Sequence, residues 1–249
     1  MKIVFTGGGT GGHFYPIIAV AEELNEIIKE RRLIAARFYY FSDSPYNSRL
    51  LFENSIEYRG VIAGKIRRYF SLLNFFDAIK TAFGILVAIW KLYLIYPDAV
   101  FSKGGYAAFP VLFAARFLHL PVIIHESDSR PGRVSVWSGK FAKRIALSYP
   151  EALSHFPSER SAVTGNPIRQ GVLNPVKQGA HEFLHLEPEV PVLLILGGSQ
   201  GAMAINDVLV DILPQLVAHY QVIHQTGENH LVDVKKRAGL LLAGNEHAE

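Results

Sequence analysis

The 249-residue chain contains no cysteine. This absence excludes disulfide bonds, thiolate catalysis and cysteine-rich zinc sites, and it is compatible with a reducing compartment. The longest uncharged stretch of the most apolar segment, Thr81–Trp90, is far shorter than the roughly 20 residues of a membrane-spanning helix. No basic and apolar leader precedes the first apolar segment, so we expect no secretion signal.

Charge is scarce and unevenly distributed. Residues 1–165 hold 20 Lys and Arg against 13 Asp and Glu, a formal charge of +7, whereas residues 166–249 hold 5 against 9, or −4. The excess predicts that the first part faces a membrane surface or a phosphorylated molecule, and we expect no nucleic-acid partner. Chance variation of a solvated surface is the alternative explanation.

Apolar strands alternate with helices in the first part of the chain. A helix is expected over Pro16–Arg31, and the expected strands are Lys2–Thr6, Arg37–Phe41, Ala99–Ser102 and Val122–His125. Such alternation predicts a parallel, doubly wound α/β sheet. Ligands of these sheets bind at the carboxyl ends of the strands.

The pattern restarts after a polar stretch, so we expect a domain boundary near Gly165. The second domain, residues 166–249, shows two βα units, with strands at Val192–Leu196 and Gln221–Gln225. A doubly wound domain normally has five or six strands. The predicted fold class is therefore α/β with two Rossmann-like parallel-sheet domains, the second incomplete.

Two glycine-rich turns each stand between an apolar strand and a helix. The first spans residues 7–12 and ends at His13, and the second spans residues 197–201. Glycine lets the backbone approach a ligand closely, and the free N–H groups of a following helix attract anions such as a diphosphate. The pair predicts two nucleotide-type domains that face each other across a cleft.

Three other motifs are disfavoured by their context. The first glycine turn matches the dinucleotide fingerprint, but Asp43 lies too far along the chain for the usual ribose acid. Ser199 stands in a nucleophile-elbow pattern, but the residues after it offer no suitable acid and histidine at later strand ends. His181 and His185 form an HExxH pattern, but the segment allows barely two helical turns and no third zinc ligand.

The segment 62–96 combines basic residues with many aromatic and aliphatic ones. For Lys65–Phe76 two interpretations stay open: a helix in an anionic membrane interface, or a core helix packed on the sheet. For Ile85–Leu94 we expect the core helix.

Five segments together resemble a known family. The segments GGGTGGHFYP, SKGGY, HES-D, GNPIR and GGSQGA, in this order, are similar to the peptidoglycan N-acetylglucosaminyltransferases of glycosyltransferase family 28, which have the GT-B fold. The resemblance runs along the whole chain, while members of the family continue for roughly another hundred residues, about the length that completes a doubly wound domain. That further part carries the uracil and ribose contacts in the family.

The resemblance implies a reaction and a set of site residues. N-acetylglucosamine would pass, with inversion, from UDP-N-acetylglucosamine to the 4-hydroxyl of an undecaprenyl-diphosphate-linked muramoyl peptide, without a metal or other cofactor, on the cytoplasmic face of the plasma membrane. His13 would be the general base and Glu126 a second catalytic residue. The implied substrate-binding residues are Thr10, Gly11, Gly12, Gly104, Gly105, Tyr106, Asp128, Asn166, Arg169, Ser199, Gln200 and Gly201. Among these, Arg169 and Ser199 would hold the donor diphosphate.

Two departures from the family pattern affect the sugar contacts. Ser127 stands where the family often has Gln, and Asp128 stands where it often has Asn. Two alternatives to the reaction stay open: a related diacylglycerol glycosyltransferase, or a non-catalytic fragment that binds only the acceptor lipid.

Overall fold

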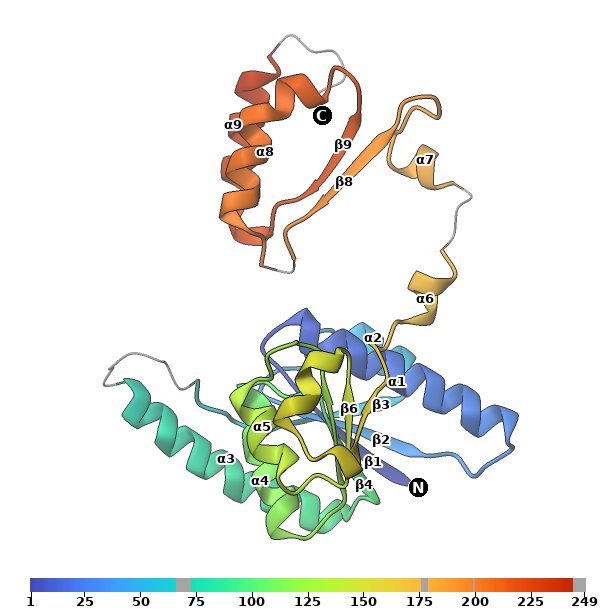
Figure 1. The fold of residues 1–249 in the computed structure, drawn as a ribbon, viewed down its shortest axis with the longest axis vertical. Coiled ribbons are helices and arrows are strands. Elements are labelled where there is room, and N and C mark those ends of the chain that lie inside the picture. The colour runs from blue at the N-terminus through green and yellow to red at the C-terminus, as the bar shows by residue number, and fades with distance from the viewer. Residues whose placement is uncertain (66–72, 176–178, 199, 244–249) are drawn as a thin grey trace. The chain divides into compact units, whose positions relative to one another are not determined.

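The chain folds into two compact units, seen here in a computed structural model that describes residues 1–65, 73–175, 179–198 and 200–243. Unit 1 comprises Met1–Asn174 and unit 2 comprises Pro175–Glu249 (Figure 1). We expected the boundary near Gly165. The structure places the division nine residues later, because the segment after Gly165 is hydrogen-bonded to unit 1, as described below.

Unit 1 contains a seven-stranded sheet in which every neighbouring pair is parallel. Its order is β3-β2-β1-β4-β5-β6-β7. The central strands are apolar because helices cover both faces, and Val4 and Phe5 of β1 are fully buried. The strands are β1 (Lys2–Thr6), β2 (Arg37–Ser42), β3 (Ile56–Gly60), β4 (Ala99–Ser102), β5 (Val122–Glu126), β6 (Arg144–Leu147) and β7 (Ser161–Val163).

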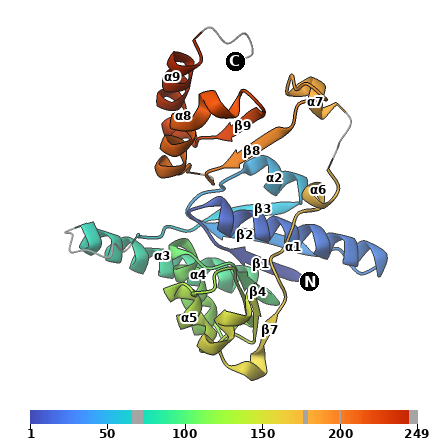
Figure 2. The ribbon, with the colours of Figure 1, turned by 45° about the horizontal axis from the view of Figure 1, so that its top comes forward.

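Two helical layers enclose this sheet (Figure 2). On one face, α1 (Gly11–Glu30) and α2 (Ser48–Glu53) pack through residues such as Phe14, Ile17 and Leu51. On the other face lie α3 (Leu73–Ile95), α4 (Phe109–Phe117) and α5 (Arg133–Gly139). Short helical turns complete the unit: η1 (Tyr106–Ala108), η2 (Pro150–His155), η3 (Ser158–Arg160) and α6 (Gln170–Leu173).

Four strands of unit 1 were predicted and three were missed. The missed strands β3, β6 and β7 carry polar or charged residues such as Glu57, Arg144 and Ser161, which break the apolar run. These strands lie at or near the edges of the sheet, where one face or one side meets solvent. Helix α1 begins at Gly11 rather than at Pro16. The sequence placed the start too late, because glycine and proline both indicate a helix break, which is absent here.

Helix α3 has one buried and one exposed side. Gly84, Ala88 and Leu92 are buried against the sheet layer, so the helix is part of the core on that side. The outward side carries large apolar side chains at spacings of three and four residues, each more than half exposed: Phe76, Ile79, Phe83, Leu86, Trp90 and Tyr93. The expectation of a core helix over Ile85–Leu94 is confirmed by the buried Ala88 and Leu92, and the exposed apolar side is an additional feature that the sequence did not predict.

By length and composition alone, α3 is apolar enough to cross a membrane. A soluble core helix passes the same test, and the packed side of α3 identifies it as a helix of the folded unit. Residues 66–72, which include most of the basic part of the predicted interfacial segment, lie outside the described residues.

Unit 2 contains the parallel pair β8 (Val192–Leu196) and β9 (Gln221–Gln225). Helices α8 (Met203–Leu216) and α9 (Leu231–Leu241) lie on the same side of these strands (Figure 1) and bury Leu209, Val210 and Val234. The short helices α7 (Ala180–Phe183) and η4 (Glu228–His230) flank them. Both expected strands of this part are confirmed at the predicted residues, and the α/β class with parallel sheets is confirmed for both units.

Candidate functional site

The candidate residues of unit 1 gather where β1, β4 and β5 end. These strands are neighbours in the sheet and all parallel, so their carboxyl ends share one edge. The glycine loop of residues 7–12 follows β1, residues 103–106 follow β4, and residues 127–132 follow β5. The predicted convergence at one edge of the sheet is therefore observed within unit 1.

The glycine loop is shaped by close packing and has free backbone donors. A Cβ on Gly8 would lie 2.5 Å from the Ser42 hydroxyl, and Gly9 adopts a φ of +91° beneath the Tyr106 ring. Within the described residues, the backbone N–H groups from Gly8 to Gly12 donate to no acceptor. Together with the N-terminal dipole of α1, these groups form a site suited to phosphate oxygens.

Tyr106 holds the loop from the side of β4. Its hydroxyl donates a hydrogen bond of 2.5 Å to Oδ2 of Asp43, which also accepts from Ser42 at 3.2 Å through Oδ1. Burial, with the hydrogen bond and charge of Asp43, raises the pKa of Tyr106 to about 12. Asp43 thus orders the glycine loop through Tyr106, which gives this carboxylate a role that needs no ribose.

His13 lies in the first turn of α1 with one ring nitrogen held and the other free. Nδ1 is 2.9 Å from the Thr10 hydroxyl oxygen, and Nε2 lies beside Gly105, where a Cβ would approach it to 3.3 Å. Burial lowers the pKa of His13, and the charge of Lys103 lowers it further, against Glu126 and Asp128. A neutral imidazole whose Nδ1–H donates to Thr10 offers its Nε2 lone pair as a base.

Glu126 is buried and organises the loop that follows β5. Its Oε1 accepts from the backbone N–H of Asp128 and its Oε2 from that of Gly132, each at 3.1 Å. With both oxygens engaged, the geometry favours a role in holding this loop over the catalytic role that the resemblance implied.

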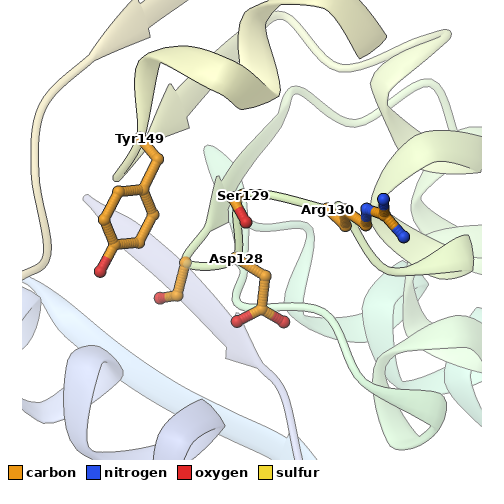
Figure 3. Close-up of a pocket in the computed structure, with 5 residues that line it drawn as sticks. Asp128, Ser129, Arg130 and Tyr149 are labelled. Atoms are coloured by element: carbon orange, nitrogen blue, oxygen red, sulfur yellow. The ribbon is translucent and has the colours of Figure 1, made fainter.

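The loop after β5 lines a pocket of about 530 Å³ formed by Ser127, Asp128, Ser129, Arg130 and Tyr149. In the view of Figure 3 the Asp128 carboxylate lies between the Tyr149 ring and Arg130, whose guanidinium extends away from both. Sequence reasoning missed Ser129, Arg130 and Tyr149. Tyr149 follows β6, a strand that was itself not predicted, so no signal placed it at this edge.

The segment after β7 crosses this edge and adds Asn166 and Arg169. The carbonyl of Gly165 lies 3.0 Å from Nε2 of His125. Oδ1 of Asn166 accepts from Ser127 at 2.8 Å and from Ser148 at 2.6 Å. The Arg169 guanidinium lies 4.5 Å from the centre of the Tyr15 ring, beside the glycine loop.

The second glycine turn belongs to unit 2. Gly201 has a φ of +74°, and a Cβ there would overlap the Thr226 carbonyl, so the turn packs tightly against the end of β9. Gln200 and Gly201 lie between β8 and α8, as predicted, while Ser199 lies outside the described residues. His181 lies on a four-residue helix, and within the described residues no cluster of acidic and histidine side chains could hold a metal ion.

Comparison with known proteins places two family models on the chain. The glycosyltransferase family 28 N-terminal domain matches residues 3–147, and the glycosyltransferase family 28 C-terminal domain matches residues 192–245. Two similar proteins are UDP-N-acetylglucosamine–N-acetylmuramyl-(pentapeptide) pyrophosphoryl-undecaprenol N-acetylglucosamine transferases. That of Treponema denticola is 40% identical over 99% of this chain and 65% of its own length. That of Lachnospira eligens is 39% identical over 93% and 64%.

Solved structures show the same fold. MurG of Acinetobacter baumannii matches with a TM-score of 0.60 and 26% identity, over 96% of this chain and 62% of its own. The Staphylococcus aureus MnaA–UDP structure matches with a TM-score of 0.65 and 16% identity, over 98% and 66%. These likenesses confirm the expected GT-B type of fold. The chain spans about 65% of the length of the Treponema relative.

Proposed function

Since the chain belongs to glycosyltransferase family 28, we propose that it transfers N-acetylglucosamine from UDP-N-acetylglucosamine to an undecaprenyl-diphosphate-linked muramoyl peptide. The product would be the lipid-linked disaccharide of peptidoglycan synthesis. The reaction would thus convert lipid I to lipid II. The names of the Treponema and Lachnospira relatives support this donor and this acceptor. The observation that carries the proposal is His13, whose pKa burial lowers and whose Nδ1 lies 2.9 Å from the Thr10 hydroxyl, beside a glycine loop with free backbone N–H groups.

His13 would act as the general base. Its Nε2 takes the proton of the acceptor 4-hydroxyl while that oxygen forms a bond to the anomeric carbon of the donor sugar. The bond between that carbon and the UDP oxygen breaks on the opposite face, so the configuration inverts. If Nδ1–H donates to the Thr10 hydroxyl oxygen 2.9 Å away, the imidazole is in the tautomer that this step requires.

The departing diphosphate gains negative charge, and the chain supplies positive partners for it. Free N–H groups near Thr10, Gly11 and Gly12, together with the Arg169 guanidinium, would receive phosphate oxygens in unit 1. In unit 2, the residues around Gln200 and Gly201 precede the N-terminus of α8, a position that also favours anions. Each unit by itself thus offers groups that stabilise negative charge, without any cofactor in the proposed reaction.

We also propose that the enzyme works at the cytoplasmic face of the membrane. The exposed apolar side of α3 from Phe76 to Tyr93 is about 26 Å long at 1.5 Å per residue. In the chain, Lys65 precedes this stretch and Lys80 lies within it. An apolar stripe with flanking cations is typical of helices in an anionic lipid interface. This placement would bring unit 1 to the lipid-linked acceptor.

A second candidate function is acceptor binding without transfer. The observation that favours it is the sheet described for unit 2, which has two strands against seven in unit 1. Transfer to diacylglycerol instead of the muramoyl acceptor is a third possibility, and the acceptor used in an assay separates it from the first.

The test is a transfer assay with radiolabelled UDP-N-acetylglucosamine and purified lipid-linked muramoyl peptide. We expect label in the lipid-linked disaccharide, loss of that label in His13→Ala, and normal transfer in His155→Ala, a matched exposed histidine of unit 1. Label transferred only to diacylglycerol would contradict the proposed acceptor. Calorimetry with UDP-N-acetylglucosamine separates transfer from acceptor binding alone, because a chain that binds only the acceptor should release no uridine-dependent heat.

A further inference from the structure

Lys103 is a buried cation in the floor of the site. It follows β4 directly and is only 4% exposed. Its backbone N–H donates to the Thr6 carbonyl at 2.9 Å, and a Cβ on Gly7 would approach the Lys103 Cβ to 3.2 Å. The lysine stem is therefore clamped between the ends of β1 and β4, directly beneath the glycine loop.

The ammonium of Lys103 has no protein partner where one would be expected. In the part of the chain that the structure describes, no carboxylate lies within 4.0 Å of it and no acceptor receives its hydrogen bond. Glu126, the acidic group whose charge acts most strongly on Lys103, already accepts hydrogen bonds from two backbone N–H groups. Lysine is almost never buried without a partner. The Lys103 Nζ is not among the fully buried atoms without a partner, so the small exposed fraction of this residue includes its ammonium, which is open to a ligand.

The charged and titratable groups that interact with Lys103 lie at the edge of the sheet where the candidate site is. His13, His125, Glu126 and Asp128 are its charged or titratable neighbours. On the adjoining strand end, the free N–H groups of the glycine loop supply donors that also have no protein acceptor. The cation after one strand and the free N–H groups after its neighbour both attract negative charge, so together they could bind one anion.

We propose that Lys103 is a substrate-binding residue whose ammonium receives a non-bridging oxygen of a diphosphate at the glycine loop. The proposal rests on the proposed function, because both substrates of that reaction carry a diphosphate. Lys103 is not among the catalytic or substrate-binding residues that the family resemblance implied, so the proposal adds a residue to the site.

The electrostatics of the site support this assignment. Burial lowers the pKa of Lys103, with Glu126 and Asp128 opposing the shift, which is the effect expected of an ammonium without a close counter-ion. The same charge lowers the pKa of His13. Removal of the charge should therefore raise the pKa of His13.

The direct experiment measures diphosphate binding to the 249-residue chain by calorimetry. The probes are inorganic pyrophosphate, farnesyl diphosphate and UDP. The variant Lys103→Met keeps the apolar stem and removes the charge, and Lys140→Met, at an exposed lysine of the same unit, is the matched control. We expect Lys103→Met to weaken pyrophosphate binding at least tenfold and Lys140→Met to leave it unchanged.

The two organic probes distinguish the sources of the diphosphate. A loss confined to farnesyl diphosphate assigns Lys103 to the lipid-linked acceptor, and a loss confined to UDP assigns it to the donor. Thermal melting and the titration of His13 by NMR accompany each variant, and Lys103→Arg provides a second variant that retains charge. A loss of pyrophosphate affinity in Lys103→Met, with Lys103→Arg close to wild type, supports the proposal, and a raised His13 pKa checks that the charge beside His13 is gone.

Unchanged pyrophosphate affinity in folded Lys103→Met overturns the proposal, as does an absence of diphosphate binding to the wild-type chain. These outcomes are separable from failure of the proposed function. If the wild-type chain transfers no sugar, but Lys103→Met binds pyrophosphate more weakly than wild type, the anion site is supported and the proposed reaction is contradicted. If the wild-type chain transfers sugar, but Lys103→Met binds pyrophosphate as tightly as wild type, the proposed reaction is supported and the anion site is contradicted.

Discussion

The imidazole of His13 can serve as a base only in its neutral form, and the surroundings of the ring favour that form. Burial and the charge of Lys103 both lower its pKa from the ordinary value of 6.5. The group is therefore protonated only at pH values below that value, and above it the Nε2 lone pair is free. The Thr10 hydroxyl supplies the second requirement by holding Nδ1.

We predict that transfer activity is independent of the His13 charge above pH 6.5 and falls about tenfold per pH unit below the lowered pKa. His13→Ala should reduce turnover by roughly 10²–10⁴-fold, the usual contribution of a positioned base. Initial rates between pH 5 and 8 would measure both effects. An acid limb that persists at the same pH in His13→Gln would assign the titration to another group.

Helix α3 shows how one element can serve both the core and a surface. Its buried side lies close to the backbone of segment 62–64, because a Cβ on Gly84 would overlap the Ile62 carbonyl oxygen. The Thr81 hydroxyl accepts from the N–H of Gly64 at 3.1 Å and donates to the Asp77 carbonyl at 2.7 Å. The other side of the helix exposes a continuous stripe of apolar side chains to solvent. Exposed apolar area of this extent marks an interaction surface in most soluble proteins.

Phe83→Ser should weaken binding to vesicles, because the exposed phenylalanine loses apolar area that would enter the lipid interface. Phe83 is 55% exposed on α3, and Phe52, 85% exposed on α2, is the matched control on the other helical layer. Co-sedimentation with phosphatidylglycerol vesicles measures the effect. Equal loss in Phe52→Ser would show that the vesicles do not distinguish the two faces.

Gly84→Ala should destabilise unit 1, because a Cβ at this position would overlap the Ile62 carbonyl oxygen. Overpacking of a core typically costs about 1–3 kcal/mol, which lowers Tm by roughly 2–12 °C in a unit of this size. Gly171, with nothing within 4 Å of its added Cβ, is the control in the same unit. Thermal melting followed by tryptophan fluorescence reports on unit 1, which contains both tryptophans. An unchanged Tm in Gly84→Ala would mean that α3 shifts without cost.

The molecule consists of two units with separate cores. Both apolar clusters of the seven-stranded sheet draw only on residues before Asn174, whereas Leu209, Val210 and Val234 form a small core of their own in unit 2. A unit of 150–200 residues buries enough surface to fold alone. The candidate base, the glycine loop and Lys103 all belong to unit 1.

A chain of residues 1–174 should therefore fold cooperatively and retain the fluorescence transition of Trp90 and Trp137. It should also keep the pKa of His13 below 6.5, because the groups that lower it, the buried surroundings and Lys103, lie within unit 1. Thermal melting and NMR titration of the shortened chain test this. A gradual, non-cooperative transition would show that unit 2 is needed for the fold of unit 1.

Local sequence patterns were sufficient where neighbouring residues decide the structure. The strands Lys2–Thr6, Ala99–Ser102 and Val192–Leu196 are short apolar runs between breakers, and the glycine turns precede helices as expected. The same patterns failed for β3, β6 and β7, because a polar residue at a sheet edge costs little and leaves no periodic signal.

The chain's own residues thus specify the alternation of strands and helices, the two glycine turns and the kind of anion chemistry that these turns favour, since all of these depend on local propensity and spacing. The folded unit specifies which distant groups meet. Tyr106 reaches Asp43 across 63 positions and Ser127 reaches Asn166 across 39. Sheet order and the burial of Lys103 arise from long-range packing, and packing between distant segments has no signature in any short stretch of sequence.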